Sequence, residues 1–418
     1  MTGLPWVVLS GVVPQADGVG IEKRAWAHLA AMATSCAPRL VLALTPAQLS
    51  RLPDLAPLRS LCESVHVATL VRTWRGRRLQ NTLAFLCQRL LLWAQPAWRL
   101  DAAALAQLRE TLRAGPVAGV FCFRLACFEL WQQAAAHQDA GAARLVVDFD
   151  DIESVAQQRA LAVDGRSLGR AHALAGRLEI GESRRLEQAA LRNAEVLVCS
   201  AVDRERLLQR APAARVGVVP NAYPVLPALP PREPGLALNL LFLGTLSYAP
   251  NIDAVDHLVR VLLPAVRAAW QGPVNLQIVG RRPTAEVLAV HRPPDIQVLA
   301  DVADVTTAYA QADVVLVPIR FGGGTRIKIL EALSLGRPVV TTTLGVEGLD
   351  FHDGRDLLIA DEPAAFAQAC ARLARDPALA TSLAREGRDT FLRLYSNEVV
   401  RARLAEVLSQ PIPSPREP

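Results

Sequence analysis

The chain has 418 residues, of which 51% are hydrophobic and 20% are charged, a composition that excludes a disordered or fibrous protein. At ~100–200 residues per domain, this length predicts two or three domains. The net charge of +5 permits an anionic partner. The chain has seven cysteines and no CxxC pair. An odd number of cysteines excludes a complete set of disulfides and indicates buried thiols in a reducing cytosol.

Short apolar runs alternate with longer helical patterns over the first 220 residues. This alternation predicts an α/β domain built on a mostly parallel sheet. The predicted strands are Trp6–Leu9, Arg39–Leu44, Ser64–Leu70, Ala118–Phe123, Arg144–Val147 and Glu195–Cys199. The first helix is expected from Glu22 to about Ala33.

The loop after the first predicted strand contains Gly18 and Gly20. It lacks the G-x-G-x-x-G order of a dinucleotide fingerprint. The sequence therefore does not support a dinucleotide-binding loop, and an ordinary β–α turn stays open as one reading of this segment.

Six arginines and three tryptophans, but no acidic residue, occur over residues 71–100. A basic, aromatic segment suits an anionic membrane face or a lipid-diphosphate acceptor; the alternative is a partly buried helix pair with a solvated arginine face. The arginines are Arg72, Arg75, Arg77, Arg78, Arg89 and Arg99. No clean run of ~20 apolar residues predicts a membrane span, and no nucleic-acid-binding module is evident. We expect a cytoplasmic protein, peripheral on the inner membrane face if this segment binds lipid.

The strand predicted at Arg144–Val147 runs into the sequence DFDDIES. Read locally, Asp148 and Asp150 form a D-x-D motif that could hold a divalent cation, or the segment could cap the next helix. The seven histidines have no metal-ligand spacing, and HExxH does not occur. The one GxSxG match, GRSLG at residues 165–169, does not follow a predicted strand, which a nucleophile elbow requires. The sequence therefore gives little support to zinc-protease or serine-hydrolase chemistry.

Six prolines between Val219 and Gly235 stop both helix and central strand, which predicts a semi-rigid linker. The strand pattern then restarts at Leu238–Leu243, Val274–Val279, Ile296–Leu299, Val314–Val317 and Pro338–Thr342. We expect a first domain over 1–220, a linker over 221–236, a second domain over 237–395, a C-terminal helix over 396–410 packing back on the first domain, and a disordered tail over 411–418. Open parallel sheets bind ligands beyond the carboxyl ends of their strands.

The sequence FGGGTRIKILEAL follows the predicted strand Val314–Val317. Its glycines permit a close backbone approach, and Thr325 can cap the helix whose N-terminus then forms an anion site. Arg326 and Lys328 add positive charge, and Glu331 could accept hydrogen bonds from ribose hydroxyls. The alternative is a glycine-rich turn before an ordinary helix with a Lys328–Glu331 surface pair.

The second half of the chain resembles the donor domain of GT-B glycosyltransferases, specifically the retaining enzymes of family 4. The resemblance is carried by FLGTLSYAPNIDAV (242–255), LQIVG (276–280), DVVLVPIRFGGGTRIKILEALSLGRPVVTT (313–342), GVEGL (345–349) and HDGRDLLIADEP (352–363). The first half resembles the acceptor domain more loosely, through ADGVG, VVDFDDIES and LVCS…VVPNAYP. A subgroup with GGGTRIK-like loops, many of whose members build cell-surface polysaccharides, is the better match.

Two departures from the family pattern accompany this resemblance. Family members carry two glutamates eight positions apart; Glu331 matches the second, which contacts the ribose, whereas the first, which touches the donor sugar, falls on Gly323. Many members also carry an arginine and a lysine after the glycine that matches Gly244, and this chain has TLSY there. The resemblance therefore assigns the diphosphate to Arg326, Lys328 and the loop backbone.

The resemblance implies a GT-B fold, two Rossmann-like domains facing across a cleft, in which Gly18 and Gly20 would face the donor diphosphate. The donor-binding residues it implies are Gly18, Gly20, Gly244, Gly323, Gly324, Thr325, Arg326, Lys328 and Glu331. The catalytic residues it implies are Arg326, Lys328 and Asp150, the last standing where the family has a polar pair near the reacting sugar.

The activity implied is a retaining hexosyl transfer from a nucleotide diphosphate-sugar to a glycan or lipid-linked acceptor in cell-surface polysaccharide synthesis. The resemblance implies neither a metal ion nor a cofactor. Two alternatives stay open: a nucleotide-sugar epimerase of the same architecture, and a non-catalytic nucleotide-sugar-binding protein.

Overall fold

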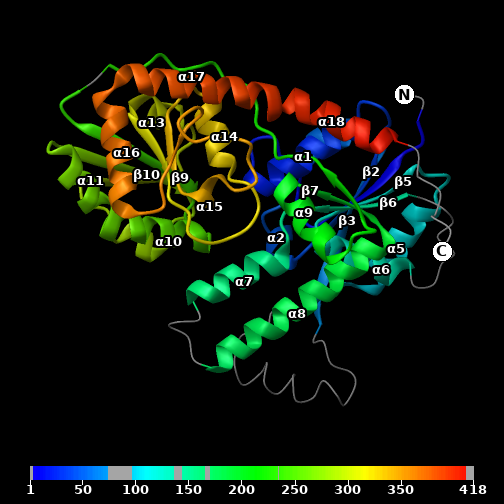
Figure 1. The fold of residues 1–418 in the computed structure, drawn as a ribbon. Coiled ribbons are helices and arrows are strands. Elements are labelled where there is room, and N and C mark those ends of the chain that lie inside the picture. The colour runs from blue at the N-terminus through cyan, green and yellow to red at the C-terminus, as the bar shows by residue number, and fades with distance from the viewer. Residues whose placement is uncertain (1–2, 74–96, 136–143, 165–169, 234, 411–418) are drawn as a thin grey trace. The chain divides into compact units, whose positions relative to one another are not determined.

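The computed structural model describes residues 3–73, 97–135, 144–164, 170–233 and 235–410. The chain divides into two compact units (Figure 1). Unit 1 comprises residues 1–220 and 401–418, and unit 2 comprises residues 221–400. Unit 1 is therefore built from two separate stretches of the chain.

An eight-stranded sheet forms the centre of unit 1, in the order β4-β3-β2-β1-β5-β6-β7-β8. Every neighbouring pair is parallel except β3 and β4, which are antiparallel. The strands are β1 Trp6–Ser10, β2 Arg39–Leu44, β3 Ser64–Thr73, β4 Ala97–Leu100, β5 Gly119–Phe123, β6 Arg144–Phe149, β7 Glu195–Val198 and β8 Arg215–Val218. The central strands are buried along their whole length, as continuous apolar runs predict.

Helices connect these strands and cover the sheet (Figure 1). They are α1 Gly20–Met32, α2 Pro46–Leu49, α3 Ala56–Leu61, α5 Ala102–Arg113, α6 Leu125–Ala135, α7 Glu153–Asp164, α8 Arg170–Asn193 and α9 Ala201–Arg210. The C-terminal helix α18, Asn397–Ser409, begins in unit 2 and ends in unit 1. Arg144 fastens its end by donating to the backbone carbonyls of Val407, Leu408 and Gln410 at 2.8–3.1 Å.

Unit 2 contains a six-stranded parallel sheet in the order β11-β10-β9-β12-β13-β14. The strands are β9 Leu238–Thr245, β10 Val274–Arg281, β11 Ile296–Ala300, β12 Val314–Val317, β13 Val339–Thr341 and β14 Leu358–Ile359. The chain leaves β9 toward β10 but leaves β12 toward β13, so the strand order reverses between β9 and β12. Ligands of open α/β sheets bind at such a reversal, beyond the carboxyl ends of the strands.

The helices of unit 2 are α10 Ala249–His257, the π-helix η2 Leu258–Leu262, α11 Leu263–Trp270, α12 Ala285–Leu288, α13 Thr306–Gln311, α14 Ile327–Ser334, α15 Thr343–Val346, α16 Pro363–Arg375 and α17 Pro377–Leu394. Helices α11 and α16 contact each other and the sheet, while α14 contacts β12, β13 and α17. The sheet is therefore covered by helices on both faces.

The proline-rich segment 221–232, here called the strap, belongs to unit 2. The backbone N–H of Leu226 donates to Ser334 Oγ at 2.9 Å, and that of Leu229 to the carbonyl of Leu335 at 3.0 Å. These bonds attach the strap alongside α14.

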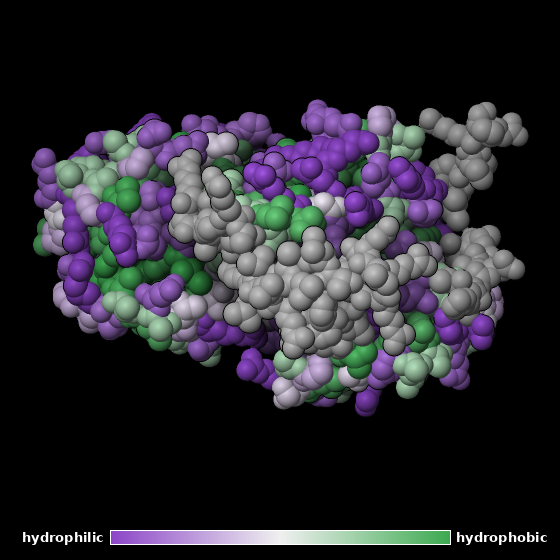
Figure 2. Space-filling view, turned by 90° about the horizontal axis from the view of Figure 1, so that it is seen from below, coloured by the Kyte–Doolittle hydropathy of each residue, from purple (hydrophilic) through white to green (hydrophobic). Residues whose placement is uncertain are grey.

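Across the described part of the chain, every helix is too short or too polar to cross a membrane. On the face drawn in Figure 2, hydrophilic residues are interspersed with hydrophobic ones. Arg72 and Arg99 of the predicted basic segment lie on the paired strands β3 and β4. The other arginines of that segment, Arg75, Arg77, Arg78 and Arg89, fall outside the described residues.

Candidate functional site

Gly244 lies at the carboxyl end of β9, beside the point where the strand order of unit 2 reverses. A Cβ atom on this residue would come within 2.6 Å of Asn251 Nδ2 and 3.1 Å of Lys328 Nζ. Because the first of these contacts is too short, a Cβ atom here would displace the Asn251 side chain from its hydrogen bonds to the Thr245 carbonyl and Lys328. The missing side chain lets Asn251 and Lys328 lie directly against the backbone of β9.

The glycine loop 322–324 lies beyond the carboxyl end of β12, on the other side of the same reversal. Gly322 has φ 109° and Gly324 has φ 65°, values that favour glycine. The guanidinium Nη1 of Arg326 donates to the carbonyls of Gly323 and Gly324. Arg326 therefore fixes the loop while keeping its positive charge there.

The expectation that Thr325 caps the following helix is wrong. Helix α14 begins at Ile327, its N-cap is Arg326, and no side chain caps it. Thr325 is instead held from the strap, because its Oγ1 accepts a hydrogen bond of 2.7 Å from Asn221 Nδ2. The positive end of α14 is thus left without a side-chain cap, beside Arg326.

Lys328 is half-buried within the first turn of α14. Its Nζ donates to Asn251 Oδ1 at 2.8 Å and lies 4.1 Å from the centre of the Phe242 ring. Burial and the neighbouring Arg326 charge lower the pKa of Lys328 to about 7, against an opposing effect of Glu331. The group is therefore poised to gain a proton when an anion arrives.

Glu331 lies one turn further along α14 and accepts a hydrogen bond from the phenol of Tyr223 in the strap. Burial and the Glu331 charge together raise the pKa of Tyr223, and they raise the pKa of the wholly buried Tyr309 as well. The alternative of a Lys328–Glu331 surface pair is wrong, since each side chain bonds to a different partner. Glu331 is a carboxylate held in one orientation beside a cationic loop.

In unit 1 the D-x-D segment follows β6. The first of its aspartates, Asp148, is fully buried and accepts a bidentate hydrogen bond from Arg24 of α1, at 2.8 Å from Nε and 2.6 Å from Nη2. Burial would lower the pKa of Arg24, but Asp148 together with Cys199 and Asp150 outweighs burial and raises that pKa. Because both oxygens of Asp148 are used in this ion pair, a metal-binding D-x-D motif receives no support from its geometry.

Asp150 is mostly buried, with its Oδ1 3.8 Å from Arg24 Nε and its backbone carbonyl accepting from Cys199 Sγ at 3.0 Å. His28 lies against the same ion pair, 3.6 Å from Asp148 Oδ2, and burial followed by the Arg24 charge lowers its pKa well below the usual value. Asp150 thus lies at the edge of a buried charge cluster rather than isolated in a loop.

Arg124, which the sequence interpretation did not single out, follows β5 with φ 73°. This left-handed conformation is uncommon for a residue other than glycine and marks functional or strained positions. Its guanidinium lies 3.7 Å from Glu153 Oε1, and its backbone N–H donates to the carbonyl of Asp148. It therefore adds a positive charge near Asp150 at the reversal between β1 and β5 in unit 1.

Gly18 and Gly20 precede or begin α1, and neither has a positive φ. A Cβ on Gly18 would lie 2.4 Å from Glu22 Oε2, which accepts from the backbone N–H of Val19 at 2.8 Å. Gly18 is therefore needed for the close approach of the carboxylate that caps α1. A structural role accounts for this glycine.

The structure brings Gly244, the glycine loop, Lys328 and Glu331 together in unit 2, and it places Asp150, Gly18 and Gly20 in unit 1. Sequence reasoning missed three contributors in unit 2: Asn221 and Tyr223, which it assigned to a linker, and Asn251, which it left without a role. The only signal for the first two was a polar and an aromatic residue among the prolines of VVPNAYP.

Comparison with protein families matches residues 237–376 to "Glycosyl transferases group 1". No curated protein gives a significant match to the chain. Among solved structures, sucrose-phosphate synthase from Thermosynechococcus elongatus is 17% identical with a TM-score of 0.64, covering 97% of this chain and 98% of that one. HepE from Anabaena, in complex with UDP-glucose, is 15% identical with a TM-score of 0.63, covering 97% and 99%.

A match to TarM is partial. It has 13% identity and a TM-score of 0.56, and it covers 73% of this chain but only 58% of TarM. Likenesses of such low identity establish the fold, and they confirm the predicted GT-B fold with its two parallel α/β sheets.

Proposed function

Because residues 237–376 match the family "Glycosyl transferases group 1", we propose that this chain transfers a sugar from a nucleotide diphosphate-sugar with retention of configuration. A hexose is the proposed sugar. The acceptor is a glycan or a lipid-linked glycan of the cell surface, a choice that rests on the resemblance of the GGGTRIK loop.

One observation supports the proposal. In unit 2, a cationic loop and an oriented carboxylate lie close together at the point where the strand order reverses. Arg326, Lys328 and the uncapped N-terminus of α14 form the anion-binding half. Glu331, with its phenol partner, forms the half that can accept hydrogen bonds from hydroxyl groups. A nucleoside diphosphate presents both chemistries, a diphosphate and a ribose diol, at neighbouring positions.

The proposed catalytic role of the loop is to stabilise the negative charge that develops on the leaving phosphate. As the glycosidic bond breaks, negative charge grows on the β-phosphate, and preorganised donors at that position lower the barrier. Lys328, Arg326 and the backbone N–H groups of the loop supply positive charge there. In the retaining reaction of the resembling family, the acceptor attacks the face from which the phosphate departs, and the phosphate itself takes the acceptor's proton. No strong protein base is then needed, and Asp150 is assigned to contact with the sugar or acceptor.

UDP-glucose is the first donor to test, because HepE, a structural neighbour over nearly the whole chain, is seen with UDP-glucose. The proposed reaction uses no metal ion.

The test is a thermal-shift panel with UDP, GDP, dTDP and ADP, each with and without EDTA. The wild type is compared with an Arg326→Ala/Lys328→Ala double variant. We expect one diphosphate to raise the melting temperature, with no effect of EDTA and no shift in the double variant. Transfer from the matching nucleotide-sugar is then followed by NMR, which reads the anomeric configuration of the product.

Several outcomes would contradict the proposal. No shift with any nucleotide would leave the glycine loop a purely structural element, and a shift that requires a divalent ion would contradict metal independence. Release of an altered sugar without an acceptor would identify an epimerase instead.

A second candidate, a non-catalytic nucleotide-sugar-binding protein, is favoured by one observation. Gly323 occupies the place of the glutamate that touches the donor sugar in the resembling family. Nucleotide-dependent stabilisation without sugar transfer or donor hydrolysis would select this candidate. Transfer by the wild type rejects it.

A further inference from the structure

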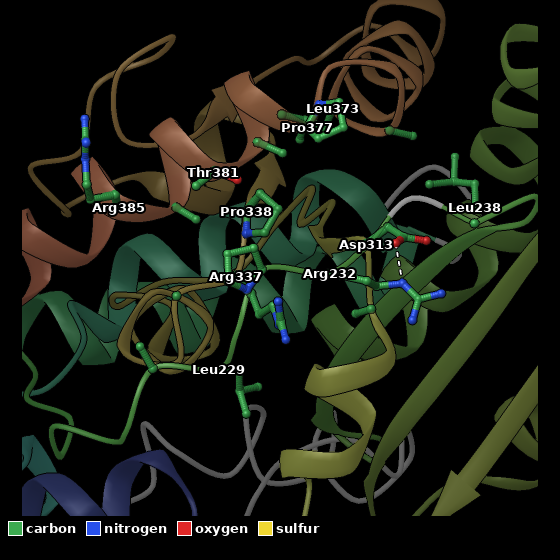
Figure 3. A pocket seen from close by; sticks show the side chains of 18 of the residues that line it. Leu229, Arg232, Leu238, Asp313, Arg337, Pro338, Leu373, Pro377, Thr381 and Arg385 are labelled. Carbon is green, nitrogen blue, oxygen red and sulfur yellow. Dashed lines mark hydrogen bonds and ion pairs between the residues drawn. The ribbon is translucent and has the colours of Figure 1, made fainter.

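A cavity of about 340 Å³ lies at the amino edge of the unit 2 sheet, the edge opposite to the glycine loop. Its walls come from the strap, from the starts of β9, β12 and β13, and from α16 and α17 (Figure 3). The volume is near the lower end of the ~300–1,000 Å³ range of small-molecule sites. The glycosyl-transfer chemistry proposed above uses none of its lining residues.

Most of the cavity wall is apolar. Leu229, Leu238, Leu373 and Trp270 contribute to it, together with small alanines of α17 such as Ala384. A second hollow of about 530 Å³ shares Pro231, Arg232, Pro377, Thr381 and Arg385 with it. The two hollows are therefore adjacent and have these residues as a common wall.

Two arginines in this apolar wall have unused donors. Arg337 is only 3% exposed; its Nη1 donates to the carbonyl of Pro230 at 3.0 Å, and its buried Nε has no partner among the described residues. Arg388 donates Nη2 to the carbonyl of Leu226 at 2.9 Å, and within the same described set its buried Nη1 has no partner. A buried donor left unpaired is costly, and both arginines are among the residues that line the cavity.

Both oxygens of the one carboxylate in the wall, that of Asp313, already accept hydrogen bonds. Asp313 accepts from Arg232 with one oxygen and from the backbone and side chain of Asn239 with the other, at 2.7 and 3.0 Å. Figure 3 shows the Arg232–Asp313 pair beside the side chain of Arg337. Since Arg385 also lines the cavity, its wall holds four arginines against one aspartate. Burial, followed by the Arg232 charge, lowers the pKa of Arg337, as expected for a cation short of a counter-ion.

We infer that this cavity is a binding site for a small amphipathic anion, a carboxylate or phosphate head on an apolar body. The head would pair with the positive charges of Arg337 and Arg388, and the body would lie against Leu229, Leu373 and Trp270. Guanidinium groups suit planar carboxylates and phosphates because they donate along two parallel directions. The position at the far edge of the sheet makes this site independent of the nucleotide site.

The experiment is calorimetric titration of the full chain with decyl phosphate and decanoate, compared with decanol, inorganic phosphate and decyltrimethylammonium. We expect both anionic amphiphiles to bind with one-to-one stoichiometry and the other three to bind at least about tenfold more weakly. Binding should be unchanged when UDP is present. Failure of UDP to bind would affect the proposed transfer reaction and leave this inference untouched.

Three variants locate the ligand. Arg388→Gln removes the unused donor and should weaken decyl phosphate at least about tenfold, the effect of a hydrogen bond to a charged group. Ala380→Phe places a ring in the cavity wall without touching an arginine and should abolish binding. Arg372→Gln, on the exposed face of α16 and outside the cavity, is the matched control and should bind as the wild type does.

Each contrary result overturns the inference. Equal binding of decanol and decyl phosphate would show an apolar cavity in which the arginines take no part. Undiminished binding by Ala380→Phe would place the ligand elsewhere. Absence of binding by every anionic amphiphile would show a cavity whose arginines are satisfied by water alone.

Discussion

Lys328 is one of only two lysines in the chain, the other being Lys23. Its pKa of about 7 arises because burial and Arg326 disfavour the ammonium form. A bound diphosphate would reverse this effect, since an adjacent negative charge favours the charged form. At pH 8 the free site is mostly neutral, so binding should draw in a proton.

We therefore predict that the affinity for UDP falls as pH rises from 7 to 9, by up to about tenfold per pH unit. Reductive methylation with ¹³C-formaldehyde gives NMR signals for the two lysines, and a Lys23→Arg variant assigns them. The Lys328 signal should titrate near pH 7 in the free protein and above pH 9 with UDP bound. An unchanged midpoint on UDP binding would contradict the assignment of Lys328 to the diphosphate.

Tyr223 offers a second test at the level of single residues. Tyr223→Phe removes the hydrogen bond that orients Glu331, and it should weaken UDP binding about two- to tenfold. The variant should not lose affinity for 2′,3′-dideoxyuridine diphosphate, because this analogue lacks the ribose hydroxyls that would donate hydrogen bonds to Glu331. Titration calorimetry measures both ligands.

The control for this prediction is Tyr395→Phe, because the Tyr395 hydroxyl accepts from the backbone N–H of Asp350 at 2.6 Å, whereas the phenol that donates to Glu331 is that of Tyr223. It should leave UDP affinity unchanged. An equal loss for UDP and its dideoxy analogue in Tyr223→Phe would indicate that Tyr223 acts on overall stability and not through the ribose.

The sequence indicated the glycine loop, Lys328 and Glu331 because all three fall within ten consecutive residues, 322–331, that follow one predicted strand. It could not predict that Tyr223 meets Glu331, which is 108 positions away, or that Asn251 meets Lys328 across 77 positions. Such pairs depend on which elements the tertiary fold places side by side. Local residue patterns carry no information about them.

Among the elements, β9 is the one whose carboxyl end lies against Asn251 and Lys328 in the proposed nucleotide site. Gly244→Ala should displace Asn251 and Lys328, since the new Cβ would lie 2.6 Å from Asn251 Nδ2. We expect UDP binding to weaken at least about tenfold, and the unfolding free energy to fall by about 1–3 kcal/mol, the usual cost of overpacking. Urea unfolding and calorimetry measure the two quantities.

The matched control is Gly181→Ala in α8, where an added Cβ meets nothing within 4 Å. It should raise the unfolding free energy by about 0.5–1 kcal/mol, because alanine favours a helix over glycine, and leave UDP binding unchanged. If Gly244→Ala also binds UDP normally, the end of β9 does not form the site.

The buried strands could be predicted from sequence because continuous apolar runs such as Arg39–Leu44 and Val314–Val317 coincide with β2 and β12. Three strands escaped prediction: β4, β8 and β14. β8 is only four residues long and half-buried, and β14 has two residues. Their pairing depends on a neighbouring strand rather than on a hydrophobic pattern of their own.

At the scale of the whole molecule, the chain leaves unit 1 after residue 220 and returns to it at residue 401. Arg144 secures the returning segment through three carbonyls and pairs with Glu195 at 2.5 Å. Arg144→Ala should therefore speed amide hydrogen exchange over residues 401–410 and lower the unfolding free energy by about 1.5–3 kcal/mol. Exchange over α14 should stay as in the wild type.

Arg403→Ala is the control, because Arg403 is exposed on α18. It should change neither exchange nor stability by more than about 0.5 kcal/mol. If Arg144→Ala leaves exchange over 401–410 unchanged, the apolar contacts of α18 and not these hydrogen bonds hold the segment in place.

Because the chain returns to unit 1 only at its C-terminal segment, unit 1 is completed late during synthesis on the ribosome. The carbonyls that Arg144 binds follow it by 263 to 266 residues. At ~5–20 residues per second, they are made about 13–50 s after Arg144. During that interval the nascent unit 1 exposes the surface that α18 later covers, and all of unit 2 is translated. A chaperone that shields this surface co-translationally would act on a half-made protein whose last helix completes its first domain.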